Sequence, residues 1–205
     1  MNVTVPLGSL TPADIPALAR LHREAFPGFF LSSLGEPFLV QFYRGFLSDD
    51  TAVSVVARGA DGTVLGAVVG TTQPAGFFSR LLKKRWPGFV LASLRAVVVN
   101  PRSAPQLLRA LRYRGGAEAG SDGALLSSIC VDPSLQRAGV GRQLVAAWAR
   151  EVAARGARTA FLTTDAQGND AANRFYRAQG WTLAESYHTH EGRLMNRYTM
   201  SLDGR

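Results

Sequence analysis

A loop that holds two glycines and two arginines offers the clearest chemistry in the sequence. The loop follows an apolar stretch typical of a buried strand, and residues 139–155 then carry apolar side chains at helical spacing. Gly139 and Gly141 open this helix without a Cβ, so a bulky anion can approach the backbone. Free N–H groups and the macrodipole favour negative charge at a helix start, and Arg137 and Arg142 add positive charge. The pattern predicts a phosphate or pyrophosphate site.

The glycine pair alone is weak evidence, because glycines often serve only to turn the chain. No Gly-Lys-Ser/Thr follows it, so the loop is not a nucleoside-triphosphate P-loop. Leu144 or Val145 stands where a dinucleotide-binding loop needs a third small residue. A second motif, residues 169–181, follows after one expected helix and one expected strand, and it combines two asparagines with a Phe-Tyr pair.

Together the two motifs resemble one known family. Residues 136–141 match the Q/R-x-x-G-x-G/A signature of the GNAT acetyltransferases, and residues 169–181 resemble the family's N-x-x-A-x-x-F/L-Y-x-x-x-G-F motif, with Trp181 in place of the usual Phe. The resemblance implies an α/β protein with the GNAT fold, in which helices flank a central mixed twisted sheet of about seven strands. It also implies a single domain over residues 1–205 that uses acetyl-CoA and releases CoA.

The family resemblance also implies roles for individual residues. In the family, the strands before and after the first helix of the motif splay apart, and the pantetheine arm lies between them like an extra strand. Carried over, the amide near Cys130 or Val131 faces the thioester carbonyl, and Tyr176 protonates the leaving sulfur, although Tyr176 as a packing residue is the alternative. The implied cofactor-binding residues are Ile129, Cys130, Val131, Gln136, Arg137, Ala138, Gly139, Val140, Gly141, Arg142, Asn169, Asn173 and Tyr176, with either Asn169 or Asn173 bonding the arm.

The general base is not evident from the sequence. Many relatives carry a glutamate on the strand that enters the cofactor loop, whereas residues 125–131 hold no carboxylate. Ser127 or Ser128 could order a water molecule, but a serine alone is a poor base. The remaining candidates, each more simply interpreted as surface charge, are Glu24, Glu36, Asp165, Glu185 and His188.

Cysteine and histidine usage predicts no metal site. His22, His188 and His190 are not spaced as ligands, and Cys130 is the only cysteine. Without an evident histidine neighbour, Cys130 is expected to be a buried strand residue and not an acyl carrier. A single cysteine permits no internal disulfide. Because the chain also lacks a signal-peptide pattern and an 18-residue apolar run, we expect a cytoplasmic protein.

The N-terminal half must supply the elements that hold these motifs. Residues 3–7 alternate like a strand, and Thr11 is expected to cap a helix that stops near Pro27. Further expected elements are a helix over 37–47, strands over 52–57 and 63–72 around an Asp-Gly turn, a strand over 158–164, a helix over 169–179, and a closing hairpin over 181–201. Gly66 and Gly70 in the second of these strands indicate a close approach of another backbone.

A basic segment, residues 76–115, is predicted as a helical insertion between the third and fourth strands. It holds nine of the Lys and Arg residues and no Asp or Glu, so it accounts for the whole net charge of +8. Its helical pieces are expected to break at Pro87-Gly88 and between Pro101 and Pro105. The segment is either a solvated cover or a surface for an anionic partner, such as an anionic acceptor or a membrane surface. No specific nucleic-acid binding is expected.

These observations predict an N-acetyltransferase that moves the acetyl group of acetyl-CoA directly to a primary amine. The expected acceptor is a small molecule such as an amino sugar or an amino-acid derivative. The alternatives are a protein N-acetyltransferase and a non-catalytic module of the same fold that binds CoA or an anionic surface. A homodimer is left open by the sequence.

Overall fold

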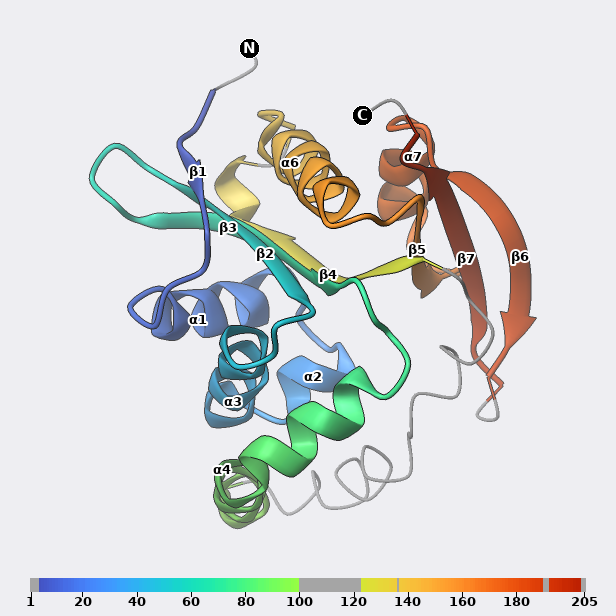
Figure 1. The fold of residues 1–205 in the computed structure, drawn as a ribbon. Coiled ribbons are helices and arrows are strands. Elements are labelled where there is room, and N and C mark those ends of the chain that lie inside the picture. Colours follow the sequence, from blue (N-terminus) through green and yellow to red (C-terminus); the bar gives the residue numbers. More distant parts are fainter. Residues whose placement is uncertain (1–3, 100–122, 136, 190–191, 204–205) are drawn as a thin grey trace.

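A seven-stranded twisted sheet with helices on both faces forms the fold in this computed structural model (Figure 1). The structure describes residues 4–99, 123–135, 137–189 and 192–203. The strands are β1 Leu7–Gly8, β2 Ala52–Arg58, β3 Val64–Thr71, β4 Ala124–Val131, β5 Thr159–Asp165, β6 Thr182–His188 and β7 Leu194–Ser201. The helices are α1 Ile15–Ala25, α2 Phe30–Ser33, α3 Glu36–Leu47, α4 Phe77–Val99, α6 Val140–Ala154 and α7 Asp170–Arg177.

The sheet has the order β1-β2-β3-β4-β5-β7-β6. Neighbouring strands run antiparallel except β4 and β5, which run parallel and are joined through α6. The mixed seven-stranded α/β sheet predicted from the sequence is therefore confirmed. The short helix α2 is an addition that the sequence pattern did not indicate.

Two apolar cores hold the helices against opposite faces of the sheet. On one face, α6 buries Leu144 and Trp148 completely, and α7 adds Tyr176 to the same cluster. On the other face, α1, α3 and α4 pack together, with Leu18 and Phe77 fully buried (Figure 1). Buried apolar area of this kind is the main source of stability, and it fixes α1 and α6 on either side of β4.

Two glycines in β3 let neighbouring groups come close. A Cβ on Gly70 would overlap the Leu125 carbonyl oxygen and lie 2.6 Å from the Trp148 ring, and one on Gly66 would lie 2.8 Å from the Cys130 carbonyl oxygen. The close approach predicted at these glycines is confirmed. It draws β3, β4 and α6 into one compact unit, which sets where α6 begins relative to the end of β4.

The N-terminal segment differs from the sequence-based expectation. Of the predicted strand over 3–7, residue 3 lies outside the described residues, and among the described ones the strand pairing with β2 covers Leu7–Gly8. The helix α1 begins at Ile15 after Asp14, so Thr11 is not the N-cap. The reason is that the Asp14 carboxylate accepts hydrogen bonds from the Thr11 amide and hydroxyl, at 2.8 and 2.7 Å, and from Arg58 on β2. This network holds a turn before the helix and ties the start of α1 to the sheet.

The described part of the basic insertion is the helix α4. The chain continues helically through Pro87, and the kink falls at Arg85, where φ is −122° and ψ is 19°, so the break predicted at Pro87-Gly88 lies two residues too late. A proline ring clashes with the carbonyl one turn earlier, which explains a distortion before the proline. The predicted break between Pro101 and Pro105 lies outside the described residues. Within the described ranges, no helix is long and apolar enough to cross a membrane.

Candidate active site

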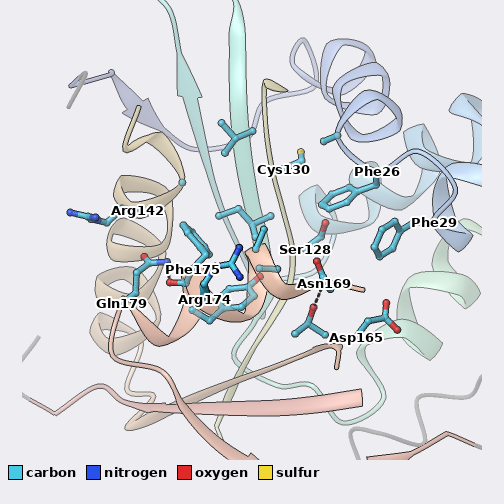
Figure 2. Close-up of a pocket in the computed structure, with 18 of the residues that line it drawn as sticks. Phe26, Phe29, Ser128, Cys130, Arg142, Asp165, Asn169, Arg174, Phe175 and Gln179 are labelled. Carbon is cyan, nitrogen blue, oxygen red and sulfur yellow. Dashed lines mark hydrogen bonds between the residues drawn. The ribbon is translucent and has the colours of Figure 1, made fainter. Parts of the chain in front are cut away.

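A cleft opens where β4 and β5 separate. These parallel strands pair only at Ala124 with Ala160 and at Leu125 with Phe161, whereas β4 stays paired with β3 as far as Val131. The ends of β4 and β5 thus diverge and leave their facing backbone edges open along a cleft of about 820 Å³. Figure 2 shows its lining, with Arg142 and Gln179 at one end and Phe26 and Phe29 at the other. A splayed pair of strands can accept an extended ligand between them.

The loop between β4 and α6 has the backbone of an anion-binding turn. Arg137 has a φ of +70° and Gly139 has a φ of +84°, both in the left-handed region. A non-glycine residue there is uncommon and marks a constraint. Within the described residues, Gln143 is the first residue after Ala138 whose backbone N–H donates to a backbone carbonyl. Its acceptor is the Gly139 carbonyl, at 3.1 Å. The N–H groups just before that of Gln143 are those that a helix start offers to an anion.

Gly141 has a packing role as well. A Cβ at this position would lie 3.2 Å from the Phe175 ring and 3.7 Å from Val131 Cγ2. The missing side chain therefore lets α7 approach the first turn of α6 closely. The glycine that favours anion access on sequence grounds also holds the two motifs of the sequence together.

The structure brings most of the predicted cofactor-binding residues to one cleft. The residues from that prediction that line it are Ile129, Cys130, Val131, Arg137, Gly139, Val140, Gly141, Arg142, Asn169 and Tyr176. Ala138 packs against the core cluster beneath α6 instead. Gln136 lies outside the described residues.

The two asparagines of the second motif have different surroundings. Asn173 is buried, and its side-chain nitrogen donates to the carbonyls of Asp165 and Asn169 while its oxygen accepts from Asn196 and Tyr198. These four bonds use the full capacity of the amide and join α7 to β5 and β7. Asn169 lines the cleft, and its side-chain nitrogen donates to Thr164 Oγ1 at 2.7 Å, so it is the asparagine of the pair that faces the cleft.

Tyr176 reaches the cleft from α7 through an aromatic cluster. Its ring lies 5.2 to 6.1 Å from the rings of Phe175, Trp181 and Tyr198. Burial raises the pKa of the phenol well above its usual value, so Tyr176 stays protonated at physiological pH. The geometry thus fits a proton donor and a packing residue alike.

Most of the side chains considered as general bases lie outside the cleft. Of the five candidates from the sequence, only Asp165 lines the cleft, and Arg193 holds it in a two-pronged ion pair with N–O distances of 2.7 Å. Glu185 pairs with Arg197 on β7, and Glu36 lies near Arg20 and Arg23 on α1. Three of the five candidates are thus engaged by arginine side chains, and the other two, Glu24 and His188, lie outside the cleft lining.

A buried polar cluster that the sequence reasoning missed lies on the α1 side of the cleft. His22 is only 3% exposed, yet it lines the cleft, and its Nδ1 lies 2.7 Å from the Tyr43 hydroxyl. The same hydroxyl hydrogen-bonds Ser128 and lies 3.8 Å from Cys130 Sγ. Burial lowers the pKa of His22 to about 4 and raises that of Cys130 to about 11. The signal was present in the sequence, because His22 falls on the apolar face of α1.

An aromatic wall continues from this cluster to the mouth of the cleft. The Phe26 ring lies 4.9 Å from His22 and 5.4 Å from Phe29, which is 43% exposed. Figure 2 shows Phe26 and Phe29 on the same side as Ser128 and across from the cofactor loop. The cleft therefore has a cationic, amide-rich end and an aromatic end, with β4 between them.

Comparisons with known proteins agree with this geometry. The model of the Acetyltransferase (GNAT) family matches residues 15–181. A GNAT-family structure from Desulfovibrio desulfuricans shares 17% identity with a TM-score of 0.65, covering 97% of this chain and 99% of the other. A Salmonella typhimurium structure solved with its cofactor acetyl-CoA shares 14% identity with a TM-score of 0.61, covering 99% and 96%.

The ribosomal-protein-S18-alanine N-acetyltransferase of Escherichia coli has the same fold, with 18% identity, a TM-score of 0.57, and 98% and 96% of the two chains covered. A search of curated protein sequences finds no matching relative. The family match covers both cofactor motifs, the helix α1 and the segment after it that holds Phe26 and Phe29. The chain therefore belongs to the GNAT family of acetyl-CoA-dependent N-acetyltransferases.

Proposed function

We propose that this enzyme transfers the acetyl group of acetyl-CoA directly to a primary amine of a small molecule, such as an amino sugar or an amino-acid derivative. The observation that carries the proposal is one continuous cleft, which joins the anion-binding loop to the aromatic wall along the open edge of β4. Direct transfer is favoured over an acyl-cysteine, because the Cys130 thiol is 2% exposed and its pKa is raised to about 11.

The proposed cofactor position follows from the charges and open backbone groups of the cleft. The pyrophosphate would bind the backbone of residues 137–142 with Arg137 and Arg142 beside it, and the pantetheine arm would bond the main chain of Ile129 and Val131. Asn169 would bond the arm from the other side. The amide near Cys130 or Val131 would then polarise the thioester carbonyl as it becomes an oxyanion.

We assign proton donation to the leaving thiolate to Tyr176. The phenol lines the cleft from the α7 side, and burial raises its pKa, so it is protonated at physiological pH. In the collapse of the tetrahedral intermediate, the C–S bond breaks, the thiolate takes the phenol proton, and the Tyr176 phenolate regains a proton from water once CoA has left. Tyr176→Phe should lower kcat about tenfold to a thousandfold while the Kd for acetyl-CoA stays nearly constant, and an unchanged kcat would leave Tyr176 as a packing residue.

The aromatic wall favours an acceptor that has an apolar face beside its amine. Phe26 and the exposed Phe29 can stack against the C–H face of a sugar ring or against an apolar side chain. Asp165, the carboxylate in the described lining, is already neutralised by Arg193. A highly cationic polyamine therefore finds no free anionic partner in the described part of the cleft.

Thiol release from acetyl-CoA across an amine panel tests this function. The panel should hold an amino sugar, an amino-acid ester, a peptide with a free N-terminus and spermidine. We expect kcat/KM to be highest for the small amines with an apolar face. Phe29→Ala should raise the acceptor KM without changing the KM for acetyl-CoA, whereas Leu47→Ala, which alters an exposed apolar residue outside the cleft, should change neither. Turnover of the peptide alone would instead indicate a protein N-acetyltransferase.

A second proposal concerns α4, which we infer contacts an anionic membrane surface of the cytoplasm. Trp86 is 63% exposed and Leu91 70%, and exposed Val90 lies on the same stretch. Lys83, three residues before Trp86, is also exposed. Apolar and aromatic side chains flanked by cations are typical of helices that lie in a membrane interface, where the cations attract anionic head groups.

Tryptophan fluorescence gives a direct test of this contact. Trp148 and Trp181 are 0% and 3% exposed, so a shift on adding vesicles reports Trp86. Vesicles with anionic lipid should shift the emission to shorter wavelength, and the shift should weaken with salt and in the Lys83→Gln variant. An unchanged spectrum at low salt would leave α4 as a solvated cover.

A further inference from the structure

Three polar side chains from three different elements meet at the α1 side of the cleft. His22 comes from α1, Tyr43 from α3 and Ser128 from β4. The Tyr43 hydroxyl lies between the other two, because it is 2.7 Å from His22 Nδ1 and also hydrogen-bonds Ser128. Their neighbour Cys130 lies 3.8 Å from the same hydroxyl. A buried chain of hydrogen bonds therefore runs from the strand β4 to the helix α1.

Both ends of this chain open to the cleft, and its middle does not. Ser128 and His22 line the cleft, while Tyr43 is 1% exposed and lies beneath them. Ser128 belongs to the strand whose next residues are assigned to the thioester. A proton that leaves an attacking amine near Ser128 can thus pass through the protein and return to solvent at a different point.

The protonation states allow one direction of transfer. Burial lowers the pKa of His22 to about 4, so its imidazole is neutral at physiological pH. The other titratable groups in the cluster are also neutral, because burial raises the pKa of Tyr43 and brings that of Cys130 to about 11. With the His22 proton on Nε2, Nδ1 accepts from Tyr43, and Tyr43 accepts from Ser128.

We propose that Ser128, Tyr43 and His22 form a proton relay that deprotonates the acceptor nitrogen, in place of the carboxylate that β4 lacks. The relay rests on the proposed acetyl transfer. As the new C–N bond forms, the nitrogen gives a proton to Ser128 Oγ, Ser128 gives its own to Tyr43, and Tyr43 gives its own to His22 Nδ1. The resulting imidazolium loses the Nε2 proton to water in the cleft, so no net charge stays in the protein. Before the next turnover the two hydroxyls rotate back and His22 returns to its Nε2-protonated tautomer, which restores the starting hydrogen-bond directions.

A weakly basic imidazole is sufficient for this step. The free amine is strongly basic, but its nitrogen loses that basicity once it is bonded to the acyl carbon and the amide emerges. The relay therefore acts on an acidic intermediate and not on the ammonium form of the acceptor. The amine must bind in its neutral form, so the rate should follow the acceptor's own deprotonation as pH rises.

The tautomer of His22 is a readout that needs no acceptor. Nitrogen-15 NMR of the imidazoles in the intact protein, with a His22→Gln variant to assign the signals, should show a neutral His22 that carries its proton on Nε2. A neutral His22 protonated on Nδ1 would overturn the relay, because Nδ1 would then donate to Tyr43 and could not accept.

Kinetics with an acceptor that the wild type uses provide the second test. Tyr43→Phe and Ser128→Ala should each lower kcat about 100-fold and leave the KM for acetyl-CoA unchanged. The double variant should lose little more than either single one, because both break the same chain. Tyr187→Phe, which removes a hydroxyl on β6 outside the cleft lining, is the matched control and should keep full activity.

Ser128→Ala is the variant less exposed to folding defects, and a wild-type kcat in it would overturn the relay. A double variant whose loss of kcat equals the product of the two single losses would also overturn it. A wild type that acetylates no amine would instead refute the proposed function and remove the reaction that the relay serves. The two failures are therefore distinguishable.

Discussion

Acidification should destabilise the protein through His22 in a narrow pH window. Burial lowers the His22 pKa from 6.5 to about 4. Below pH 6.5 the unfolded chain binds this proton, whereas the folded protein does not bind it until about pH 4, so the free energy of unfolding falls as pH falls through this window. The shift corresponds to roughly 3 kcal/mol in total, of which about 2 kcal/mol should be lost between pH 7.5 and pH 5.

Urea unfolding of the wild type and of His22→Gln at these two pH values measures this loss. The variant has no imidazole to protonate at this site, so its free energy of unfolding should fall by about 2 kcal/mol less than that of the wild type. His188→Gln, which alters an exposed histidine on β6, is the matched control and should behave like the wild type. Equal losses in the wild type and His22→Gln would refute the buried neutral imidazole, and with it the protonation pattern of the relay.

Three further predictions follow from buried contacts. Gly70→Ala should destabilise the fold by about 1–3 kcal/mol in thermal unfolding, because its Cβ would overlap the Leu125 carbonyl and crowd Trp148. Arg58→Met should lower the free energy of unfolding by about 2–4 kcal/mol at pH 7 in urea unfolding, because it leaves the buried Asp14 carboxylate without its cation. Burial raises the Asp14 pKa, but the hydrogen bonds from Arg58 and Thr11 outweigh it and lower the pKa overall. The cost of the substitution should therefore shrink as pH falls through that lowered pKa. Cys130, with a pKa raised to about 11, should resist iodoacetamide in the native protein and react once urea unfolds it, as mass spectrometry can show.

The cofactor end of the cleft could be predicted from the sequence because its chemistry depends on the backbone. Glycines at a helix start and an asparagine-to-tyrosine spacing are local patterns, and local patterns survive in a single sequence. In the structure Gly139, Gly141, Asn169 and Tyr176 line one cleft, and their binding of the cofactor stays a prediction. Asn173 shows the limit of this reasoning, because spacing cannot tell which of two asparagines is already fully bonded inside the fold.

The acceptor end could not be predicted, since it depends on contacts between distant segments. His22, Tyr43 and Ser128 lie far apart in the sequence, and only the packing of α1 and α3 on β4 brings them together. The kink of α4 at Arg85 was displaced from its prediction for a related reason, because a proline distorts the turn before it and not its own position.

The binding of acetyl-CoA to the loop between β4 and α6 is the central claim, and calorimetry on two charge reversals tests it most directly. Arg142 lines the cleft in the first turn of α6, and Arg150 is exposed on the same helix outside the cleft lining. We predict that Arg142→Glu weakens acetyl-CoA binding at least about tenfold, through repulsion of the pyrophosphate, while Arg150→Glu binds like the wild type. Equal affinity of all three proteins in a folded state would contradict the account.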